Sequence, residues 1–185
     1  MWKKFCNWVL YKQWGWTTDV TEDHPNKYII CLAPHTSNWD FVLGQLYSGA
    51  KGMKTNFLMK KEWFFFPLGI LFKHLGGIPV IRHKHTSMTD SMAEAAKAAN
   101  TFHLCITPEG TRSPNPEWKK GFYFIALKAG LPILLYGADY EKKLIRCTKT
   151  IIPTGNLEED MREIKLYFKD FKGKKPQNFT IGEIS

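Results

Sequence analysis

The segment from Cys31 to Phe41, CLAPHTSNWDF, places a histidine and an aspartate five positions apart, directly after an apolar run. If a strand ends there and a helix follows, His35 lies just past the strand and Asp40 lies in the first turn of the helix. An aspartate that accepts a hydrogen bond from one ring nitrogen fixes the tautomer and leaves the other nitrogen as a base near neutral pH. The pair therefore predicts a general base. If the pair is considered by itself, the alternative is that Asp40 only caps the helix and that His35 is a loop residue with no chemical role.

A nucleophile supplied by the protein is not evident near this pair. The sequence contains no G-x-S-x-G motif, and Ser37 lacks the strained strand-to-helix turn that exposes a nucleophilic serine. Cys105 lies inside the apolar run HLCIT, which is typical of a buried strand residue. We therefore expect the base to deprotonate a hydroxyl or amine of a bound substrate, which then attacks an electrophile directly.

A second polar cluster, ITPEGTRS from Ile106 to Ser113, brings Glu109, Gly110 and Arg112 to the end of another apolar run. Glycine permits close backbone approach, and the forked donors of arginine match a phosphate. Arg82, at the end of GGIPVIR, converges on the same place if the two runs are parallel strands of one sheet. The cluster predicts a phosphate-binding pocket, and a surface turn with a structural ion pair is the alternative for either stretch taken singly.

The elements that must position these residues alternate along the chain. Short apolar, β-branched runs predict strands, and apolar residues at helical spacing predict helices. We expect strands at residues 28–33, 56–60, 78–82, 103–107, 131–138 and 144–152, and helices at 39–49, 62–76 (broken), 86–100, 119–130 and 156–171. This alternation predicts an α/β fold with a mostly parallel sheet flanked by helices, and a site at the carboxyl ends of the strands.

Composition indicates a single globular domain over residues 1–185, because 44% hydrophobic and 23% charged residues are ordinary values and no linker divides the chain. Lysine and arginine number 26 against 17 acids, a net charge of +9, so we expect an anionic partner. The absence of a zinc knuckle, helix-turn-helix or RNP-like motif argues against nucleic acid. The four scattered cysteines contain no C-x-x-C pair and indicate reduced thiols in a cytosolic protein.

The order of four blocks, APHTSNWD, GGIPVIR, ITPEGTRS and KKGFYFIALKAGLPILLYG, resembles the glycerolipid acyltransferase family, typified by 1-acyl-sn-glycerol-3-phosphate acyltransferases. The resemblance covers residues 28–140, the expected catalytic core, and implies a glycerol-3-phosphate acyltransferase-like fold. It makes His35 the catalytic base and Asp40 the acid that orients it. It also implies that the hydroxyl of a lysophospholipid attacks the thioester of acyl-CoA or acyl carrier protein, without an acyl-enzyme. The most direct reaction would convert 1-acyl-sn-glycerol-3-phosphate to phosphatidic acid.

The resemblance further implies a set of substrate-binding residues: Arg82 at the acceptor's phosphate, Glu109, Gly110, Thr111 and Arg112 at its head group, and Lys120 as an additional charge. The last block, which contains Pro132, is implied to line the acyl pocket. No cofactor is implied beyond the acyl thioester, which is a co-substrate. We expect no metal, because His83 and His85 in RHKHTS have no carboxylate or cysteine cluster near them in sequence. Another lysolipid, an amino-acid lipid or a sugar lipid as acceptor, and a non-catalytic membrane lipid-binding module, remain the alternatives.

The amino-terminal segment, residues 1–24, predicts an amphipathic helix with Trp2, Phe5 and Trp8 near one face and lysines off it. Tryptophan and lysine at this spacing favour the surface of an anionic bilayer, whereas a helix that packs on the core carries a similar stripe. The aromatic run EWFFFPLGILF, residues 62–72, could likewise either contact a bilayer or pack on the core.

No run of about eighteen apolar residues predicts a membrane span. We therefore expect a cytoplasmic protein attached peripherally to the cytoplasmic face of a membrane. Residues 172–185, rich in lysine, are expected to form a frayed basic tail.

Overall fold

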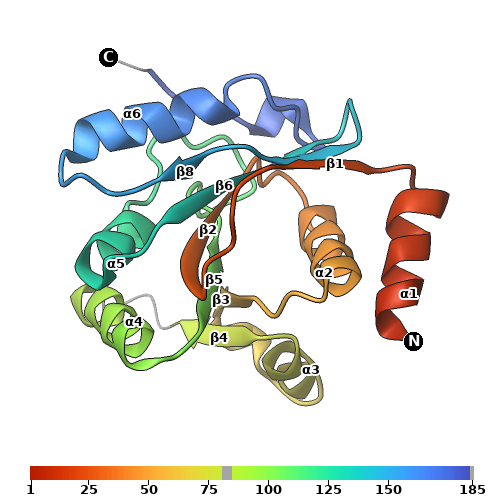
Figure 1. Ribbon diagram of the computed structural model, residues 1–185, viewed down its shortest axis with the longest axis horizontal. Coiled ribbons are helices and arrows are strands. Elements are labelled where there is room, and N and C mark those ends of the chain that lie inside the picture. The colour runs from red at the N-terminus through yellow and green to blue at the C-terminus, as the bar shows by residue number, and fades with distance from the viewer. Residues whose placement is uncertain (81–84, 184–185) are drawn as a thin grey trace.

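The computed structural model describes residues 1–80 and 85–183, and within these the centre of the molecule is an eight-stranded sheet (Figure 1). Its strands are β1 (Thr17–Val20), β2 (Lys27–Ala33), β3 (Asn56–Lys60), β4 (Gly77–Val80), β5 (Phe102–Ile106), β6 (Ile133–Asp139), β7 (Leu144–Cys147) and β8 (Thr150–Ile151). The order is β1-β7-β6-β2-β5-β3-β4, with β8 paired to β6. Strands β6, β2, β5, β3 and β4 run parallel to one another, which confirms the predicted mostly parallel sheet.

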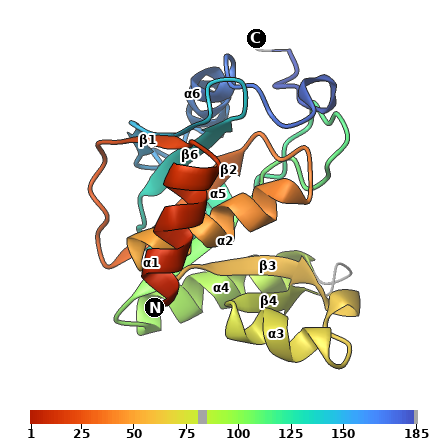
Figure 2. The ribbon, with the colours of Figure 1, turned by 90° about the vertical axis from the view of Figure 1, so that its right-hand side faces the viewer.

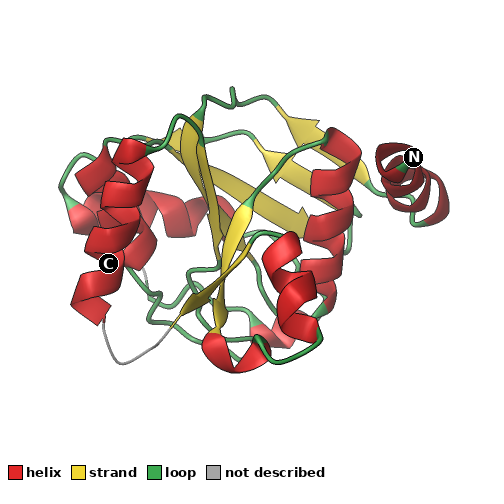
Figure 3. Cartoon of the chain, turned by 90° about the horizontal axis from the view of Figure 1, so that it is seen from below, coloured by secondary structure: helices red, strands yellow, loops and turns green. Residues whose placement is uncertain are grey.

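Helices cover both faces of this sheet. They are α1 (Trp2–Asn7), the π-helix η1 (Trp8–Gln13), α2 (Trp39–Lys51), the 3₁₀ turn η2 (Lys61–Trp63), α3 (Leu68–His74), α4 (His85–Ala98), α5 (Gly121–Ala129), α6 (Leu157–Phe168) and the 3₁₀ turn η3 (Pro176–Asn178). Figures 1 and 3 show α1, α2 and α3 on one side of the sheet and α4, α5 and α6 on the other. The predicted α/β class is therefore confirmed.

The two faces follow from the alternation of side chains along the central strands. On β2, Ile29 and Cys31 belong to the core under α5 and α6, whereas Tyr28 and Ile30 belong to the core under α2 and the amino-terminal helix. Each of these four residues is at most 6% exposed. A strand buried on both faces explains why its sequence is a continuous apolar run rather than an alternating one.

The sheet differs from the prediction at the edge that carries β1. The sequence does not predict a strand at Thr17–Val20, because TTDV is short and three of its four residues are polar, yet this segment pairs in parallel with β7. The strand predicted at residues 144–152 is divided into β7 and β8, both antiparallel to β6. Gly137 pairs with Arg146 and Ile133 pairs with Ile151. These two pairs are four residues apart on β6 and five residues apart on the β7–β8 segment. One extra residue of this kind is a β-bulge, which interrupts the ladder.

The amino-terminal helix packs on α2 through small and apolar residues. Cys6 and Leu10 are fully buried, and the Asn7 side chain donates to the Ala50 carbonyl at 3.1 Å. Gly49 of α2 faces Cys6 so closely that an added Cβ would lie 2.6 Å from its Sγ. This interface leaves the tryptophans of the helix exposed. None of the helices in the described residues is long and apolar enough to cross a membrane.

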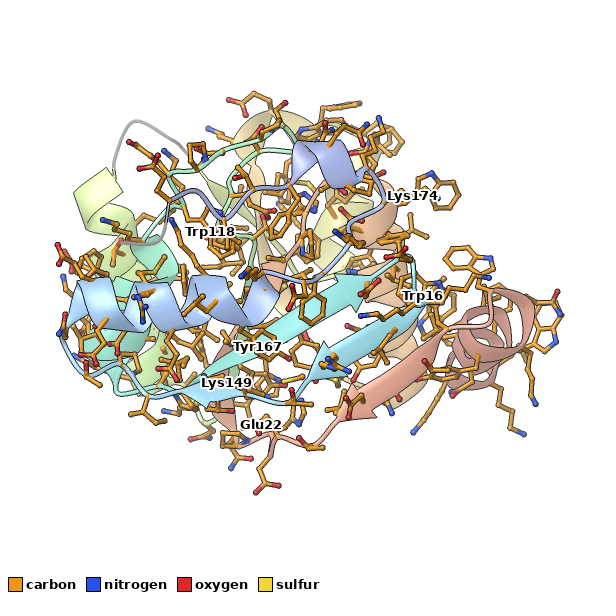
Figure 4. All side chains as sticks on the ribbon, turned by 90° about the horizontal axis from the view of Figure 1, so that it is seen from above. Trp16, Glu22, Trp118, Lys149, Tyr167 and Lys174 are labelled. Atoms are coloured by element: carbon orange, nitrogen blue, oxygen red, sulfur yellow. The ribbon has the colours of Figure 1, made fainter. Side chains whose placement is uncertain are left out.

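The carboxyl-terminal segment is not frayed where the structure describes it. Phe171 is 8% exposed, and the Trp118 indole N–H donates to the Thr180 carbonyl at 3.1 Å. The lysines KGKK (172–175) indicated a solvated tail, but the apolar residues on either side of them, Phe171 and Phe179, pack against the core. The segment from Phe171 to Thr180 therefore packs on the body of the protein, and Figure 4 labels Lys174 within it.

Candidate active site

Three neighbouring strands end at one edge of the sheet, where their following segments meet. Strand β2 pairs in parallel with β5 and with β6, and the registers Cys31 with Ile106 and Ala33 with Gly137 set their ends level. The loop carrying His35 follows β2, the loop carrying Glu109 follows β5, and Tyr140 follows β6. The predicted convergence of His35 and the EGTR stretch is therefore observed.

The Asp40 carboxylate is held in place by donors from two directions. Its Oδ2 accepts the Thr36 and Ser37 backbone N–H groups at 2.7 and 2.8 Å, and its Oδ1 accepts the Tyr140 hydroxyl at 2.7 Å. Asp40 lies in the first turn of α2 and is 3% exposed. Hydrogen bonds to the charged form and the positive end of a helix dipole both stabilise a carboxylate in this position. The site thus contains a fixed, buried negative charge.

His35 lies directly beside this charge. Its Nδ1 is 3.3 Å from Asp40 Oδ2, and the two side chains are 14% and 2% exposed. Among the described residues Nδ1 has no aligned hydrogen-bond acceptor, so the contact is close but its N–H does not point directly at the oxygen. The arrangement suits a ring that gains a proton next to a carboxylate.

Glu109 attaches the EGTR loop to the histidine loop. Its Oε1 and Oε2 accept the His35 backbone N–H at 2.9 and 3.1 Å, and the residue is 3% exposed. Burial raises the pKa of Glu109 to about 7; the His35 N–H opposes this rise, and the negative charge of Asp40 adds to it. Its carboxylate therefore faces the protein backbone, which makes it a residue that positions His35.

Replacing Glu109 with glutamine is expected to flatten the dependence of stability on pH. The pKa of this carboxyl rises from its usual 4.5 to about 7, so the native state binds the proton more tightly than the unfolded chain does. The resulting stabilisation is present below the unfolded pKa and is lost as the pH rises through the folded pKa, on the order of 3 kcal/mol in total. Glutamine keeps an acceptor for the His35 N–H and cannot ionise. Urea unfolding at about pH 5 and about pH 8 measures the difference.

Glu117→Gln is the matched control, because Glu117 is an exposed glutamate of the same loop. This control should retain the slope of the wild type. If Glu109→Gln and wild type lost equal stability between the two pH values, the Glu109 carboxyl would not be the group that titrates in this range.

The remaining EGTR residues lie on the surface of the loop. Gly110 has φ +66°, a left-handed conformation that favours glycine, and an added Cβ would lie 3.2 Å from Lys119 Cγ. Thr111 accepts the Ser113 N–H through its hydroxyl at 3.3 Å. Arg112 and Lys120 are exposed, Lys120 immediately before α5.

Three residues singled out in the sequence lie at or beyond a gap in the described structure. Arg82 and His83 lie outside the described residues, and His85 is the first residue of α4. Within the described residues, no group of three or more histidine, cysteine or acidic side chains is arranged to hold a metal ion.

The nearby hydroxyl and thiol groups do not act as exposed nucleophiles. Ser37 is 9% exposed, and its Oγ accepts the Trp39 N–H at 3.2 Å near the start of α2. Burial raises the pKa of the Cys31 thiol well above its usual value, and burial raises the pKa of Cys105 to about 12. Thiols in such surroundings remain protonated at neutral pH and are poor nucleophiles.

Sequence reasoning missed Tyr140 and the carboxyl-terminal segment as parts of this site. Tyr140 follows the apolar run LPILLYGA, so its position just past a strand end was the available signal. Pro132, in the block that the resemblance places at the acyl pocket, precedes β6 at the opposite end of the sheet from His35. There it borders a shallow hollow with Thr21, Glu22 and Thr150.

Comparison with known proteins identifies the fold and the family. Residues 17–135, more than half of the chain, match the sequence model of the family described as Acyltransferase. The crystal structure of the 1-acyl-sn-glycerophosphate (LPA) acyltransferase PlsC from Thermotoga maritima matches with a TM-score of 0.63 and 20% sequence identity, covering 90% of this chain and 75% of that chain. That likeness shows a shared fold. No curated protein matches this chain. The family match spans both the His35–Asp40 segment and the EGTR loop, and the chain therefore belongs to the acyltransferase family.

Proposed function

We propose that this protein transfers a fatty acyl group from acyl-CoA or acyl carrier protein to the hydroxyl of a lysophospholipid, with His35 as the general base. The favoured acceptor is 1-acyl-sn-glycerol-3-phosphate, which gives phosphatidic acid. The observation that supports this proposal best is the fixed Asp40 carboxylate, 3.3 Å from the His35 ring, in a site whose neighbouring serine and cysteines are not exposed nucleophiles.

In the proposed step the ring and the carboxylate act as one unit. With Nδ1 beside Asp40, Nε2 of His35 accepts the proton of the acceptor hydroxyl as its oxygen attacks the thioester carbonyl carbon. The developing imidazolium is stabilised by the Asp40 charge. When the carbon–sulfur bond breaks, the imidazolium returns its proton to the departing thiolate. The products are an ester and a free thiol, and His35 is again neutral.

Cations of the EGTR loop would hold the acceptor's phosphate. Arg112 and Lys120 are exposed, and the loop that carries Arg112 is joined to the histidine loop by Glu109. Arg112 offers a bidentate fork and Lys120 a point charge, both suited to a phosphate monoester. Gly110 and Thr111 contribute a turn that a head group can approach closely, and Arg82 is proposed as a further phosphate ligand. Glu109 is proposed to act on the head group only indirectly, through His35.

Product analysis tests this function. Purified protein is mixed with a panel of lysolipids, an amino-acid lipid and a sugar lipid, each offered with acyl-CoA and with acyl carrier protein, and the products are identified by mass spectrometry. Phosphatidic acid formed fastest from 1-acyl-sn-glycerol-3-phosphate is the expected result. Faster acylation of an acceptor without a phosphate monoester would overturn the proposed acceptor, and no transfer to any acceptor would indicate a non-catalytic lipid-binding module.

We also propose that the α1–η1 segment and the η2–α3 segment attach the protein to a membrane. Because α1 and η1 pack on α2 through Cys6 and Leu10, aromatic residues of both are left in solvent: Trp2 of α1 is 60% exposed and Trp8 of η1 is 53% exposed. The η2–α3 segment is similar, with Phe66 83% exposed and Ile70 64% exposed. Figure 2 shows α1 and α3 on the same side of the molecule. Exposed aromatic residues next to lysines favour the interface of an anionic bilayer.

Replacing Trp8, Phe66 and Ile70 together with serine is expected to weaken binding to anionic vesicles about 100-fold, since each side chain contributes on the order of 1 kcal/mol when it enters a bilayer. Sedimentation with phosphatidylglycerol-containing vesicles measures the binding. Ile152→Ser with Leu166→Ser is the matched control, because these apolar side chains are 67% and 40% exposed but belong to neither the α1–η1 segment nor the η2–α3 segment. Equal loss in both proteins, or no loss in the first, would refute this attachment surface.

A further inference from the structure

We propose that Tyr140 is a positioning residue for the acyl transfer, and that residues 171–175 hold it and the histidine loop in place. The inference rests on the proposed function, because it assigns a role at the same site. The sequence alone predicts no contribution from Tyr140 or from this segment. The contacts that carry the inference join three distant parts of the chain: the loop after β2, the residue after β6 and the segment after α6.

The first contact is the hydrogen bond from the Tyr140 hydroxyl to Asp40 Oδ1, 2.7 Å long. The two backbone donors to Asp40 both bind Oδ2, the oxygen that faces His35. The tyrosine therefore holds the other end of the carboxylate and opposes rotation of the group about its Cβ–Cγ bond. Burial raises the pKa of Tyr140, and the nearby Asp40 charge raises it further, so the phenol remains a donor at neutral pH.

The Tyr140 ring is partly buried and makes two further contacts. The Trp16 ring meets it edge-on, with centroids 5.0 Å apart and an interplanar angle of 88°. Lys174 Nζ lies 5.6 Å from the centre of the Tyr140 ring and 5.2 Å from that of Trp39. Figure 4 shows Trp16 and Lys174 at the same end of the molecule. These contacts fix the direction in which the hydroxyl points.

The carboxyl-terminal segment binds Tyr140 and the histidine loop through its backbone. The Lys172 carbonyl accepts the Tyr140 N–H at 2.8 Å, and the Lys175 N–H donates to the Thr36 hydroxyl at 3.2 Å. Between them Gly173 lies against the histidine loop, where an added Cβ would be 2.7 Å from Thr36 Oγ1 and 3.1 Å from Pro34 Cβ. A backbone strap of this kind restrains the loop that supplies two hydrogen bonds to Asp40.

Tyr140→Phe tests the inference because it removes the hydroxyl and keeps the ring. We expect kcat to fall about 10-fold with KM within about twofold of wild type, since the hydroxyl acts on the reacting unit and not on substrate binding. Tyr123→Phe is the matched control: its hydroxyl also donates to a buried aspartate, Asp160, at 2.7 Å, in another part of the fold. This control should lower stability and leave kcat unchanged.

A second measurement does not depend on turnover. The ring ¹⁵N signals of His35, assigned among the six histidines by comparison with His35→Ala, report the ring's hydrogen bonding at a fixed pH. We expect these signals to move in Tyr140→Phe and to stay in place in Tyr123→Phe. If the wild type transfers no acyl group but the signals still move in Tyr140→Phe, the proposed function is wrong, whereas the conclusion that Tyr140 positions Asp40 beside His35 is retained.

The strap is tested by Gly173→Ala, whose extra methyl group has no room beside Thr36. We expect it to reproduce the loss of kcat, whereas Gly121→Ala, at a position with open space around the new Cβ, should not. Unchanged kcat and unchanged His35 signals in Tyr140→Phe would overturn the role of Tyr140. An equal fall of kcat in Tyr140→Phe and Tyr123→Phe would also overturn it, because such a fall would reflect lost packing alone.

Discussion

His35→Ala is expected to yield a folded protein whose acyl transfer is about 1,000-fold slower than that of wild type, because the variant lacks the base. The fold should survive for a specific reason. The histidine loop is held by the His35 backbone N–H, which bonds to Glu109, and by the Thr36 and Ser37 backbone N–H groups, which bond to Asp40. None of these contacts uses the imidazole. Initial rates of thiol release, with circular dichroism to confirm folding, measure the effect.

His103→Ala is the matched control for this experiment. His103 is partly buried, its Nδ1 contacts the Lys54 carbonyl at 3.0 Å and its ring stacks on Tyr28, so its removal disturbs packing without touching the site. It lies at the start of β5, at the end of the sheet away from His35. A rate for His35→Ala within tenfold of that for His103→Ala would show that the imidazole is not the base.

The position of the site was predictable because it depends on strand ends. An apolar run such as YIICLA that is buried on both faces is visible in sequence, and parallel neighbours bring their carboxyl ends to one edge. The spacing of His35 and Asp40 then follows from one strand end and one helical turn. The family resemblance added the chemistry, and the match over residues 17–135 confirms the family.

The role of Glu109 was not predictable in the same way. Glutamate in a glycine-containing turn usually faces solvent, and the family resemblance implied that Glu109 binds the acceptor's head group. In the structure the carboxylate turns inward and accepts the His35 N–H, because that backbone donor would otherwise be left without a partner beside the sheet. The direction of a side chain at a loop position depends on the tertiary neighbours, which spacing does not encode.

The carboxyl-terminal segment illustrates a different limit. The three lysines of KGKK (172–175) predict a solvated segment. The glycine between them, Gly173, lies against the histidine loop. The path of the segment is therefore set by Phe171 and Gly173 and not by the lysines. An added Cβ on Gly137 of β6 would lie 2.0 Å from the Phe171 ring, so the glycine provides the space that the ring fills. Complementarity between residues 34 positions apart is a property of the folded chain, and no local pattern reveals it.

Asp40→Asn is expected to lower kcat about 1,000-fold with little change in KM. The amide has the shape of the carboxylate: its oxygen can accept the Thr36 and Ser37 N–H groups, and its NH₂ can donate to the Tyr140 hydroxyl, so the loop should keep its structure. What is lost is the negative charge beside the His35 ring. The imidazolium that forms as the acceptor is deprotonated would then have no counter-charge, and the barrier rises.

Asp160→Asn is a close control, because Asp160 is also 3% exposed and also accepts a tyrosine hydroxyl and a backbone N–H, at 2.7 and 2.8 Å. This control should affect unfolding and not turnover. Combining Asp40→Asn with His35→Ala then separates a coupled pair from two independent residues. If the carboxylate acts through the ring, the double variant should be no slower than His35→Ala alone. Multiplied losses in the double variant would mean that Asp40 acts on the substrate by another route, and that the two residues do not form one catalytic unit.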